Sequence, residues 1–339
     1  MAVVDAAPAR GQLQGEDCRD LAPERGPRVS VVVPAYLSHE TVAGCLEAFR
    51  RQEYRSFEVV VVDSSPDDRT ARVVRGFPEV RLVRSRRRLL PHAARNLGVR
   101  RSRGELLVFM DPDVYPRSDC LGELVAAYGA TGRPVVGALS CHGRRWLDVG
   151  IHLCKFSKWL PGGTARPVDM SPTANMLVDR ATFQAAGGFE GGLMLGDALF
   201  SWRLREAGWT LGFAPRAEVA HHHTSGLRAF LRERYVRGVM FGVLRADWEG
   251  LGRGRSLLYL AVSLLPVRLA RILALTAGHC RRAGQLRQLL ATLPVPLLGH
   301  AASLLGESRA YLARVVRPRP GASRRGGRIA ARAAPLTRT

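Results

Sequence analysis

Three apolar, β-branched runs near the start of the chain constrain its fold more than any other feature of the sequence. They are RVSVVVPAY at 28–36, FEVVVVD at 57–63 and ELLVFM at 105–110. Continuous apolar runs of this length, without the alternation of a half-exposed strand, are typical of strands that are covered on both faces. The sequence therefore predicts a sheet that lies between two layers of helices.

Helical patterns separate these strands. Val42, Cys45, Leu46 and Phe49 recur at i, i+3, i+4 and i+7, with Ser38 as a candidate cap. Further helices are expected after the turn SSPDD and over AARNLGVRR, and a shorter strand is expected over VRLV. This alternation with short links predicts an α/β fold with a doubly wound, mostly parallel, Rossmann-like sheet. No G-x-G-x-x-G follows the first strand, which disfavours a dinucleotide-binding oxidoreductase.

Polar side chains follow the predicted strands at their carboxyl ends, where sheets of this kind bind ligands. Tyr36 ends the first run, Asp63 ends the second, and Asp111 and Asp113 follow the third within LVFMDPDVYP. Two carboxylates that flank one residue can converge on a hard divalent cation such as Mg²⁺ or Mn²⁺. Taken alone, a D-x-D pattern is short and common, and it favours a simpler interpretation as a strand cap followed by a turn.

The charge balance predicts an anionic partner. Lys and Arg number 51 against 29 Asp and Glu, a net charge of +22 that comes almost entirely from Arg. Phosphate, nucleic acid and an acidic lipid surface all satisfy this requirement, so composition does not choose among them. Nucleic-acid binders usually interleave aromatic residues with their basic ones, and the Arg-rich C-terminus does not, so no nucleic-acid partner is expected.

The cysteines and the N-terminus indicate a reducing compartment. Six cysteines are scattered without a C-x-x-C pair, which favours a cytosolic setting over a zinc or redox motif. The first twenty residues carry four acids and no apolar core of a signal peptide, so we expect no secretory signal. The main part of the chain is therefore expected in the cytoplasm.

The chain changes character beyond residue 250. Two apolar stretches, SLLYLAVSLLPVRLARILALTAG and LLATLPVPLLGHAASLL, are interrupted by Pro266 and by Pro294 and Pro296. Neither is a clean span of twenty apolar residues, so helices that lie in the membrane interface or re-enter it fit better than two transmembrane segments. A helical appendage packed on the rest of the protein explains the pattern equally well.

Composition divides the chain into four parts. They are a disordered lead-in, an α/β domain, a hydrophobic helical and membrane-associated region, and a basic disordered tail, at 1–27, 28–248, 249–315 and 316–339 respectively. No acid occurs after Arg309, and the arginines of the tail are Arg317, Arg319, Arg324, Arg325, Arg328, Arg332 and Arg338.

In the order and character of its motifs, the chain resembles the family 2 glycosyltransferases, GT-A fold enzymes that transfer a sugar from a nucleotide diphosphate. VSVVVPAY is similar to their first strand, FEVVVVDSSPDDRT to their second strand and turn, and HAARNLGVRRSRGELLVFMDPDV to the segment that ends in their metal-binding D-x-D. The resemblance continues through SPTANMLVDRATFQAAGGFE, GDALFSWRLREAGW and APRAEVAHHH, so it covers roughly residues 28 to 245. This ordered set is much more specific than any one motif.

The resemblance implies a nucleotide-sugar site and a metal site at the strand ends. Arg95 either faces the diphosphate or braces Asp111, although an ordinary surface helix would also explain it. Asp113 is the implied metal ligand and His221 completes the shell; alternation puts His223 on the same face, and a solvated patch is the alternative. An imidazole ligand tilts the metal toward Mn²⁺, with Mg²⁺ also possible. The residues implied for the nucleotide sugar are Pro34, Ala35, Tyr36, Asp63, Arg95, Asn96 and Asp111.

The family's catalytic base lies at the start of a helix, in a G-E-D stretch. Here the sequence reads Leu195, Gly196, Asp197, with Leu199 where a second acid is usual, so Asp197 is retained and its acidic neighbours are not. One carboxylate is enough for general base catalysis, and Asp197 can also serve as a helix cap. The residues implied on the acceptor side are Gly188, Phe189, Glu190, Trp202 and Arg203. A surface loop explains Glu190 as well, and core packing explains Trp202 as well.

The loop HGRRWLDVGIHLCKFSKWLPGG separates the metal motif from the base motif. Its residues Trp146, Lys155, Lys158 and Trp159 can contact a glycan or a lipid phosphate, and plain loop surface is the slightly favoured interpretation. The nucleobase, sugar and acceptor depend on loops of this kind and are not readable from the sequence.

The resemblance predicts an inverting, metal-dependent glycosyltransferase of the hexosyltransferase type, acting in cell-envelope or glycan and glycolipid biosynthesis. Its expected partners are a nucleotide-diphosphate sugar, a glycan or lipid-linked acceptor and an anionic membrane surface. The expected location is the cytoplasmic face of the cell membrane, peripheral or partly embedded. The alternative is a catalytically degenerate basic protein that binds membrane or nucleic acid. A nucleotidyltransferase is disfavoured because PAYLSHET offers no Gly/Lys loop for phosphates.

Overall fold

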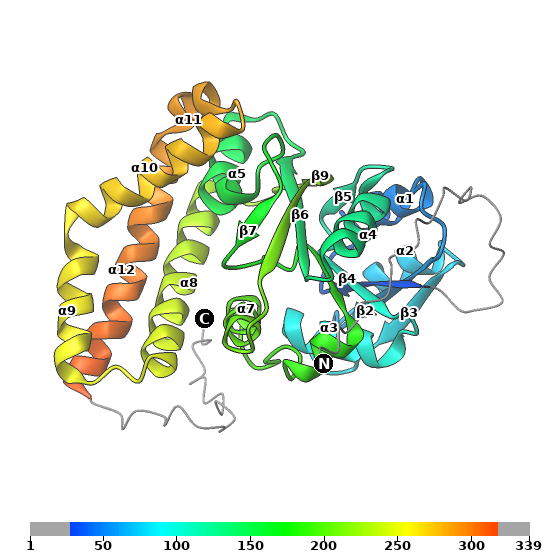
Figure 1. Cartoon of the computed structure of the whole chain (residues 1–339), viewed down its shortest axis with the longest axis horizontal. Helices are drawn as coiled ribbons and strands as arrows, with labels where there is room; N and C mark the ends of the chain where they lie inside the picture. Colours follow the sequence, from blue (N-terminus) through cyan, green and yellow to red (C-terminus); the bar gives the residue numbers. More distant parts are fainter. Residues whose placement is uncertain (1–27, 318–339) are drawn as a thin grey trace, which may run out of the picture.

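The computed structural model describes residues 28–317, which form a central sheet covered by helices, with a layer of long helices at one side (Figure 1). The predicted lead-in and nearly all of the predicted tail lie outside the described residues. The strands are β1 (Val29–Ala35), β2 (Phe57–Asp63), β3 (Val80–Arg84), β4 (Leu106–Met110), β5 (Val114–Pro116), β6 (Val135–Cys141), β7 (Arg166–Val168), β8 (Asn175–Asp179) and β9 (Leu211–His221).

The helices follow the expected alternation in the first half of the chain and become the main element in the second. They are α1 (Val42–Arg50), α2 (Arg69–Arg75), α3 (Pro91–Arg101), α4 (Cys120–Thr131), α5 (Trp146–Phe156), the 3₁₀ turn η1 (Ser157–Trp159), α6 (Arg180–Ala185), α7 (Gly196–Glu206), α8 (Leu227–Trp248), α9 (Arg253–Leu264), α10 (Pro266–Arg282), α11 (Leu286–Thr292) and α12 (Pro294–Val316).

Half of the sheet is parallel, in the order β3-β2-β1-β4. All seven residues of β1 are buried, which confirms the strand covered on both faces that the sequence predicts. Val31 and Val33 pack into one layer with α1 and α4, while Val32 packs into the other with α6 and α7. This side-to-side alternation follows from the two-residue period of a strand.

The other half of the sheet is mixed, which the sequence does not predict. β8 runs antiparallel between β4 and β6, and β9 pairs in parallel with β6 and antiparallel with β5 and β7. A bulge at Gly137 and Ala138 shifts the register of β6 against β9. A side chain at Gly137 would collide with the amide of Asn175 and the carbonyl of Ala217, so only glycine fits there.

One local expectation is wrong in detail. The hydroxyl of Ser38 does not cap α1; it accepts a hydrogen bond from the backbone N–H of Tyr36 at 3.2 Å. The backbone carbonyl of Ser38 accepts instead from the N–H of Val42 at 2.9 Å. The hydroxyl of Ser38 therefore stabilises the end of β1, and only its backbone carbonyl contacts the start of α1.

The C-terminal helices pack on the α/β domain as an appendage. α12 runs along α8, where side chains at Gly238 or Gly306 would collide with the opposite backbone. Val295 of α12 also contacts Ile151 of α5, and Leu244 of α8 packs on Leu199 of α7. Since α8 belongs to both parts, the boundary predicted after residue 248 stays a prediction.

Several large apolar side chains are exposed on the outer surface of α9 and α10. Leu257, Leu258, Leu264, Leu265 and Val267 are each between 49% and 65% exposed. Within residues 28–317, no single helix has the length and hydropathy to cross a membrane alone. Two pairs of consecutive helices have the required length and hydropathy only when each pair is taken together. Both pairs are bent, α9 with α10 by 65° and α11 with α12 by 74°.

Candidate active site at the carboxyl edge of the sheet

Asp111, Asp113 and His221 come together from three separate places in the chain. Asp111 follows β4, Asp113 precedes β5 and His221 ends β9, and each offers one ligand atom within 4.8 Å of the others. Pairing of Val114 with His221 brings β5 and β9 side by side and leaves the Oδ2 of Asp113 3.9 Å from the Nε2 of His221. The convergence that the D-x-D and the EVAHHH segment imply is therefore present in the fold.

The electrostatics of this cluster favour a cation. Burial raises the pKa of Asp113, the neighbouring His221 opposes that rise, and the Asp111 carboxylate adds to it. Among the described residues, the Nδ1 atom of His221 is buried without a hydrogen-bond partner. Two crowded carboxylates and one imidazole are a donor set that fits Mn²⁺ or Mg²⁺, which would relieve the repulsion between the acids.

Arg95 braces Asp111 from inside the protein. Its side chain is 2% exposed, so the interpretation as an ordinary surface arginine is wrong. The Nη2 atom of Arg95 donates to the Oδ1 of Asp111 in an ion pair, and Nη1 lies 3.5 Å from the Nδ1 of His92. Such a buried, charge-assisted bond fixes the carboxylate in one orientation.

Asp197 lies in the first turn of α7 and lines a cavity of about 280 Å³ between the α/β domain and the long helices. Its Oδ1 accepts a hydrogen bond from the N–H of Ala198 at 2.9 Å, so it satisfies one free donor of the first turn, but the N-cap position belongs to Leu195 and the cap interpretation of Asp197 is wrong. The same atom lies 3.9 Å from the Nε2 of His92. Burial, with a smaller contribution from Arg95, lowers the pKa of His92 to about 3.

A series of side chains thus joins the two groups of acids. Asp111 contacts Arg95, Arg95 approaches His92, and His92 approaches Asp197. His92 and Arg95 lie three residues apart on α3, on one face of that helix. The position of His92 was not predicted from the sequence, where its only local signal is the i, i+3 spacing to Arg95 within HAAR.

Asn96 fixes the glycine-rich loop before α7. Its Nδ2 donates to the carbonyl of Phe189 at 2.7 Å, and its Oδ1 accepts from the N–H of Phe189 at 3.1 Å. Gly187 and Gly188 have φ of 76° and 64°, which is the backbone freedom expected of GGFEGG. Both polar ends of Asn96 are engaged with the loop, so its contact with a donor stays a prediction.

The residues predicted on the acceptor side divide into two groups. Arg203 lies 3.6 Å from Glu190 and donates to the carbonyl of Gly188 at 3.4 Å, so these residues support the loop. Trp202 packs instead against Phe241 and Trp248 of α8, with ring centroids 6.0 and 5.5 Å away. The core interpretation of Trp202 fits this packing better than a place beside the acceptor.

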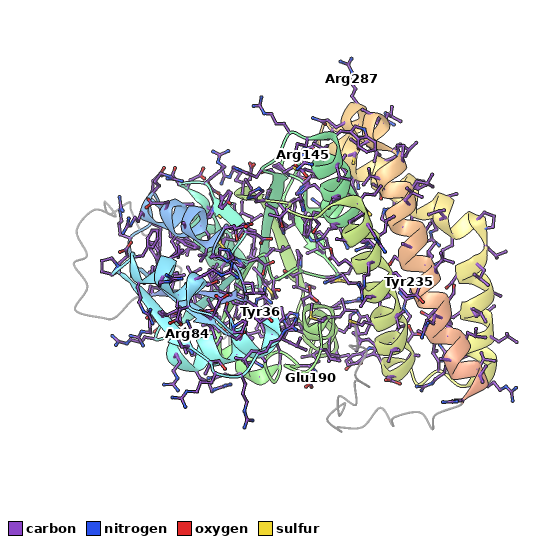
Figure 2. The ribbon with its side chains drawn as sticks, turned by 180° about the vertical axis from the view of Figure 1, so that it is seen from behind. Tyr36, Arg84, Arg145, Glu190, Tyr235 and Arg287 are labelled. Carbon is purple, nitrogen blue, oxygen red and sulfur yellow. The ribbon has the colours of Figure 1, made fainter. Side chains whose placement is uncertain are left out.

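Two basic side chains, Arg84 and Arg88, lie beside Asp63 and Tyr36 at the ends of β2 and β1. Asp63 is fully buried, accepts from the N–H of Ser65 at 2.9 Å and lies 3.3 Å from the Nη1 of Arg84. The guanidinium of Arg88 lies 4.4 Å from the centre of the Tyr36 ring. Figure 2 shows Tyr36 and Arg84 on the α/β domain, away from Tyr235 on α8. The sequence signal for these two arginines was the basic run RSRRR at the end of β3.

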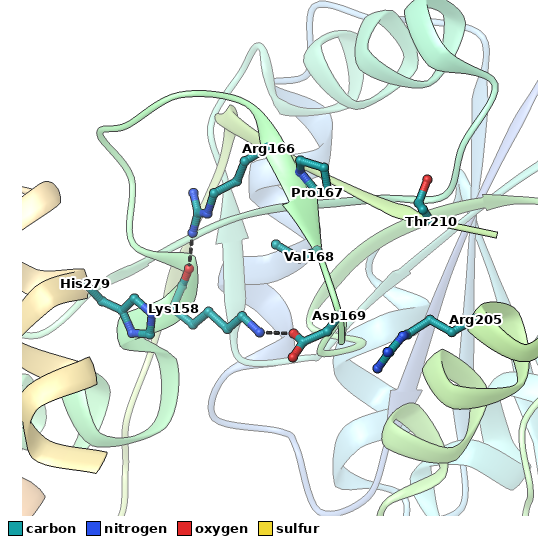
Figure 3. Close-up of a pocket in the computed structure, with 8 residues that line it drawn as sticks. All are labelled: Lys158, Arg166, Pro167, Val168, Asp169, Arg205, Thr210 and His279. Carbon is teal, nitrogen blue, oxygen red and sulfur yellow. Dashed lines mark hydrogen bonds and ion pairs between the residues drawn. The ribbon is translucent and has the colours of Figure 1, made fainter. Parts of the chain in front are cut away.

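The loop between the two motifs is folded rather than plain surface. Lys155 and Trp159 line the Asp197 cavity together with Arg234 and Arg237 of α8. On the other side of η1, a basic depression of about 420 Å³ is lined by Lys158, Arg166, Arg205 and His279, with Asp169 as its acid (Figure 3). Arg166 donates to the carbonyl of Lys158 at 2.6 Å, and Lys158 pairs with Asp169.

Comparison with known proteins gives matches to glycosyltransferases. Residues 30–156 match the family described as Glycosyl transferase family 2. The chain is similar to the glycosyltransferase AglE of Haloferax volcanii, with 28% identity over 56% of this chain and 64% of AglE. It is 33% identical to undecaprenyl-phosphate 4-deoxy-4-formamido-L-arabinose transferase of Pseudomonas aeruginosa, over 35% of this chain and 38% of that enzyme. It thus spans less than two thirds of either relative.

The fold is also similar to a solved structure, the mannosyltransferase PcManGT of Pyrobaculum calidifontis in complex with GDP-Man and Mn²⁺. The TM-score is 0.55 at 22% identity, over 87% of this chain and 88% of the other. This likeness confirms the predicted GT-A type α/β fold. The family match ends at residue 156, so it includes Asp111 and Asp113 but not Asp197 or His221.

Proposed function

We propose that this chain, whose residues 30–156 match Glycosyl transferase family 2 and whose fold is of the GT-A type, is an inverting glycosyltransferase acting on a nucleotide-diphosphate sugar. The observation that carries the proposal is the series of contacts from Asp111 through Arg95 and His92 to Asp197. It links a cluster suited to a metal diphosphate with a carboxylate that can accept a proton. Displacement of a diphosphate by a hydroxyl requires both.

In the proposed reaction, the acceptor oxygen bonds to the anomeric carbon as the bond from that carbon to the diphosphate breaks. Asp197 takes the proton of the acceptor hydroxyl, and attack from the face opposite the leaving group inverts the anomeric configuration. Because burial keeps His92 neutral at pH 7, it lies beside the Asp197 carboxylate without competing for that proton. Arg95 holds the Asp111 carboxylate in one orientation toward the donor.

The metal we propose is a divalent cation held by Asp113 and His221, with Asp111 beside it. Such an ion supplies positive charge that neutralises the departing diphosphate. The relative from Pyrobaculum calidifontis is described with Mn²⁺. An imidazole in the donor set supports Mn²⁺ for this chain, with Mg²⁺ as the alternative.

The acceptor we propose is a lipid-linked phosphate or a glycan attached to one. The Asp197 cavity combines apolar side chains from three helices, Phe241, Ile272 and Leu304, with the cations of Arg234 and Arg237. An acceptor with a hydrocarbon chain next to a phosphate matches this combination. The relative from Pseudomonas aeruginosa is named for undecaprenyl phosphate, which supports the same class.

We further propose that the protein works at the cytoplasmic face of the cell membrane, peripherally or partly embedded. The exposed leucines of α9 and α10 lie among arginines of the same helices, such as Arg271. Apolar side chains that enter the bilayer boundary and cations that meet anionic headgroups act together in such binding. No observation favours the alternative of a degenerate nucleic-acid-binding protein.

Thermal unfolding of the full chain with a panel of nucleotide diphosphates and their sugars, with and without Mn²⁺, tests the proposal. A donor that binds only the folded state must raise the melting temperature, and the rise should need the metal. Asp113→Ala should lose the metal-dependent rise, while Asp197→Asn should keep it and lose transfer. If no nucleotide raises the melting temperature, or if Asp113→Ala responds as the native chain does, the proposal is wrong.

A further inference from the structure

A second cluster of metal-ligand side chains lies beside the candidate active site and takes no part in the reaction proposed above. Cys141 ends β6, His152 lies on α5 and His223 follows β9, and each offers one ligand atom within 4.8 Å of the others. We propose that these three residues bind a thiophilic divalent cation, and that Zn²⁺ fits them best. The proposal does not depend on the glycosyltransferase function.

The donor set distinguishes this site from the cluster of two aspartates and His221. One thiolate and two imidazoles suit Zn²⁺, whereas carboxylate oxygens suit Mn²⁺ and Mg²⁺. Bond lengths of about 2.0–2.3 Å in a tetrahedral zinc site put neighbouring ligand atoms about 3.3–3.6 Å apart. The Nδ1 of His152 and the Nε2 of His223 are 3.1 Å apart. The thiol of Cys141 lies within 4.8 Å of both nitrogens.

The surroundings of His152 leave the correct nitrogen free for a metal. Its Nε2 lies 3.1 Å from the carbonyl oxygen of Leu139, and since a carbonyl only accepts, Nε2 carries the proton. The lone pair of His152 is therefore on Nδ1, the atom that faces His223. A backbone carbonyl that fixes the tautomer in this way is the usual support of a zinc-binding histidine.

Binding requires the loss of one proton. Without metal, the Nε2–H of His223 donates to the Nδ1 of His152. On binding, His223 carries its proton on Nδ1 instead, and the Cys141 thiol releases its proton to solvent, so one proton leaves per ion bound. The bound ion then has a thiolate and two neutral imidazoles as ligands, with one position open to water.

Charge and burial around the cluster support a cation. His152 is 1% exposed, and burial lowers its pKa to about 3, so it is in the neutral form that binds metals. Burial raises the pKa of the Cys141 thiol; the Asp148 carboxylate lies close enough to raise it further, and the same negative charge would attract a cation. Asp148 lies one turn before His152 on α5, so a cation at the thiol would meet an acid there. Cys141 is half-buried, which leaves an entry path.

The site also touches the active site. The rings of His223 and His221 stack with centroids 4.5 Å apart and an angle of 14° between their planes. An ion held by His223 would join the ends of β6 and β9 to α5 and so steady the ring of His221. This effect on His221 rests on the proposed function, whereas the binding of the ion itself does not.

Co²⁺ in place of Zn²⁺ tests the assignment, because a thiolate ligand gives cobalt a strong charge-transfer band in the near ultraviolet. Titration of the full chain is expected to produce this band, to saturate at one band-forming ion per chain, and to reverse on addition of Zn²⁺. Cys141→Ser should lose the band, and His152→Gln should need at least about tenfold more Co²⁺. Cys280→Ser, a free cysteine on α10 outside the cluster, is the matched control and should titrate normally.

The variant Asp113→Ala separates the two sites. The band should persist in it whether or not the chain proves to transfer a sugar, because Asp113 is not a ligand of this site. Absence of the band in the native chain, or its survival in Cys141→Ser, would overturn the proposal. Should Cys141→Ser fail to fold, alkylation of the native chain followed by mass spectrometry decides. Zn²⁺ should slow the modification of Cys141 at least about tenfold, and equal rates with and without Zn²⁺ reject the site.

Discussion

The two halves of the sheet are built by different rules. Strands β1 to β4 are parallel, a short helical link precedes each of β2, β3 and β4, and the ends of β2 and β4 provide Asp63, Asp111 and Asp113. Strands β5 to β9 are mixed in direction, and the chain around them provides Asp197 and His221. The first half lies within the region that matches the glycosyltransferase family, and the second lies mostly beyond it.

This difference separates two tasks. Under the proposed function, the first half would bind the nucleotide-diphosphate donor through the end of β2 and the pair of acids after β4. The second half packs against the first through contacts between residues far apart in the chain. It contributes to the cavity that Asp197, Arg234 and Arg237 line. Donor binding should therefore depend mainly on the first half, and acceptor choice on the second.

The largest effect should come from the metal ligand of the first half. Asp113→Ala should lower transfer by at least about a thousandfold, because metal charge stabilises the leaving group by several kcal/mol. The measurement is sugar transfer at saturating Mn²⁺. Asp67→Ala, which removes an exposed acid paired with Arg69, is the matched control and should leave the rate within a factor of two or so. Equal rates for Asp113→Ala and the control would contradict the metal assignment.

Asp197→Asn should distinguish the proposed roles of the two halves most clearly, because it should change the turnover rate and not donor affinity. Loss of the base is expected to lower the turnover rate about 10²–10⁴-fold, while donor affinity in the presence of Mn²⁺ stays the same. Single-turnover kinetics and calorimetric donor titration measure the two quantities. Glu206→Gln, at the other end of α7, is the control. A parallel loss of donor affinity would show that the two halves are not independent.

We expect the long helices, and not the α/β domain, to bind the membrane. Replacing Leu257 and Leu258 with Ser should weaken binding to anionic vesicles by about tenfold or more, because each leucine buries apolar surface in the bilayer boundary. Flotation assays measure the change, and Trp209→Ser, at an exposed site on the α/β domain, is the control. Unchanged flotation of the leucine variant would rule out this face as the attachment surface.

The contact between α8 and α12 should be sensitive to side-chain size. Gly238→Ala would press a methyl group on the backbone of Ser303, and overpacking of this kind costs about 1–3 kcal/mol of unfolding free energy. Chemical denaturation measures the loss. Gly129→Ala in α4 has open space around it and should be neutral or stabilising, as replacement of glycine within a helix usually is. Equal stability of the two variants would mean that the helix contact is loose.

The last prediction concerns how the free energy of unfolding changes with pH. Because burial lowers the pKa of folded His92 to about 3 from its ordinary 6.5, its contribution to stability is present above pH 6.5 and is lost as the pH falls toward 3. His92→Gln should therefore flatten the acid side of the stability curve by about 1 kcal/mol per pH unit. His142→Gln, at an exposed histidine, should change the slope less. The same slope in both variants would mean that His92 titrates normally in the folded protein.

The parallel half could be predicted from the sequence because its signals are local. The runs before Tyr36, Asp63 and Asp111 each define a buried strand, and parallel strands that share a sheet bring their carboxyl ends to one edge. Arg95 was predicted only as one of three possibilities, since its burial depends on how α3 packs on the sheet.

The mixed half could not be predicted in the same way. β8 inserts between β4 and β6 by antiparallel pairing over long separations, and a two-residue period gives no information on which strand is the neighbour. The same holds for the cavity at Asp197, whose wall comes from α8 and α12, about 40 and 100 residues later in the chain.

The sequence by itself determined the buried strands, their order in the first half and the acids at their ends, because these follow from the spacing of neighbouring residues. The family resemblance implied that His221 meets Asp113, whereas only the tertiary structure decided that His92 lies between Arg95 and Asp197 and that Cys141, His152 and His223 form a second cluster. Each of these contacts joins residues whose proximity is set by the packing of separate elements, and no local period encodes that packing.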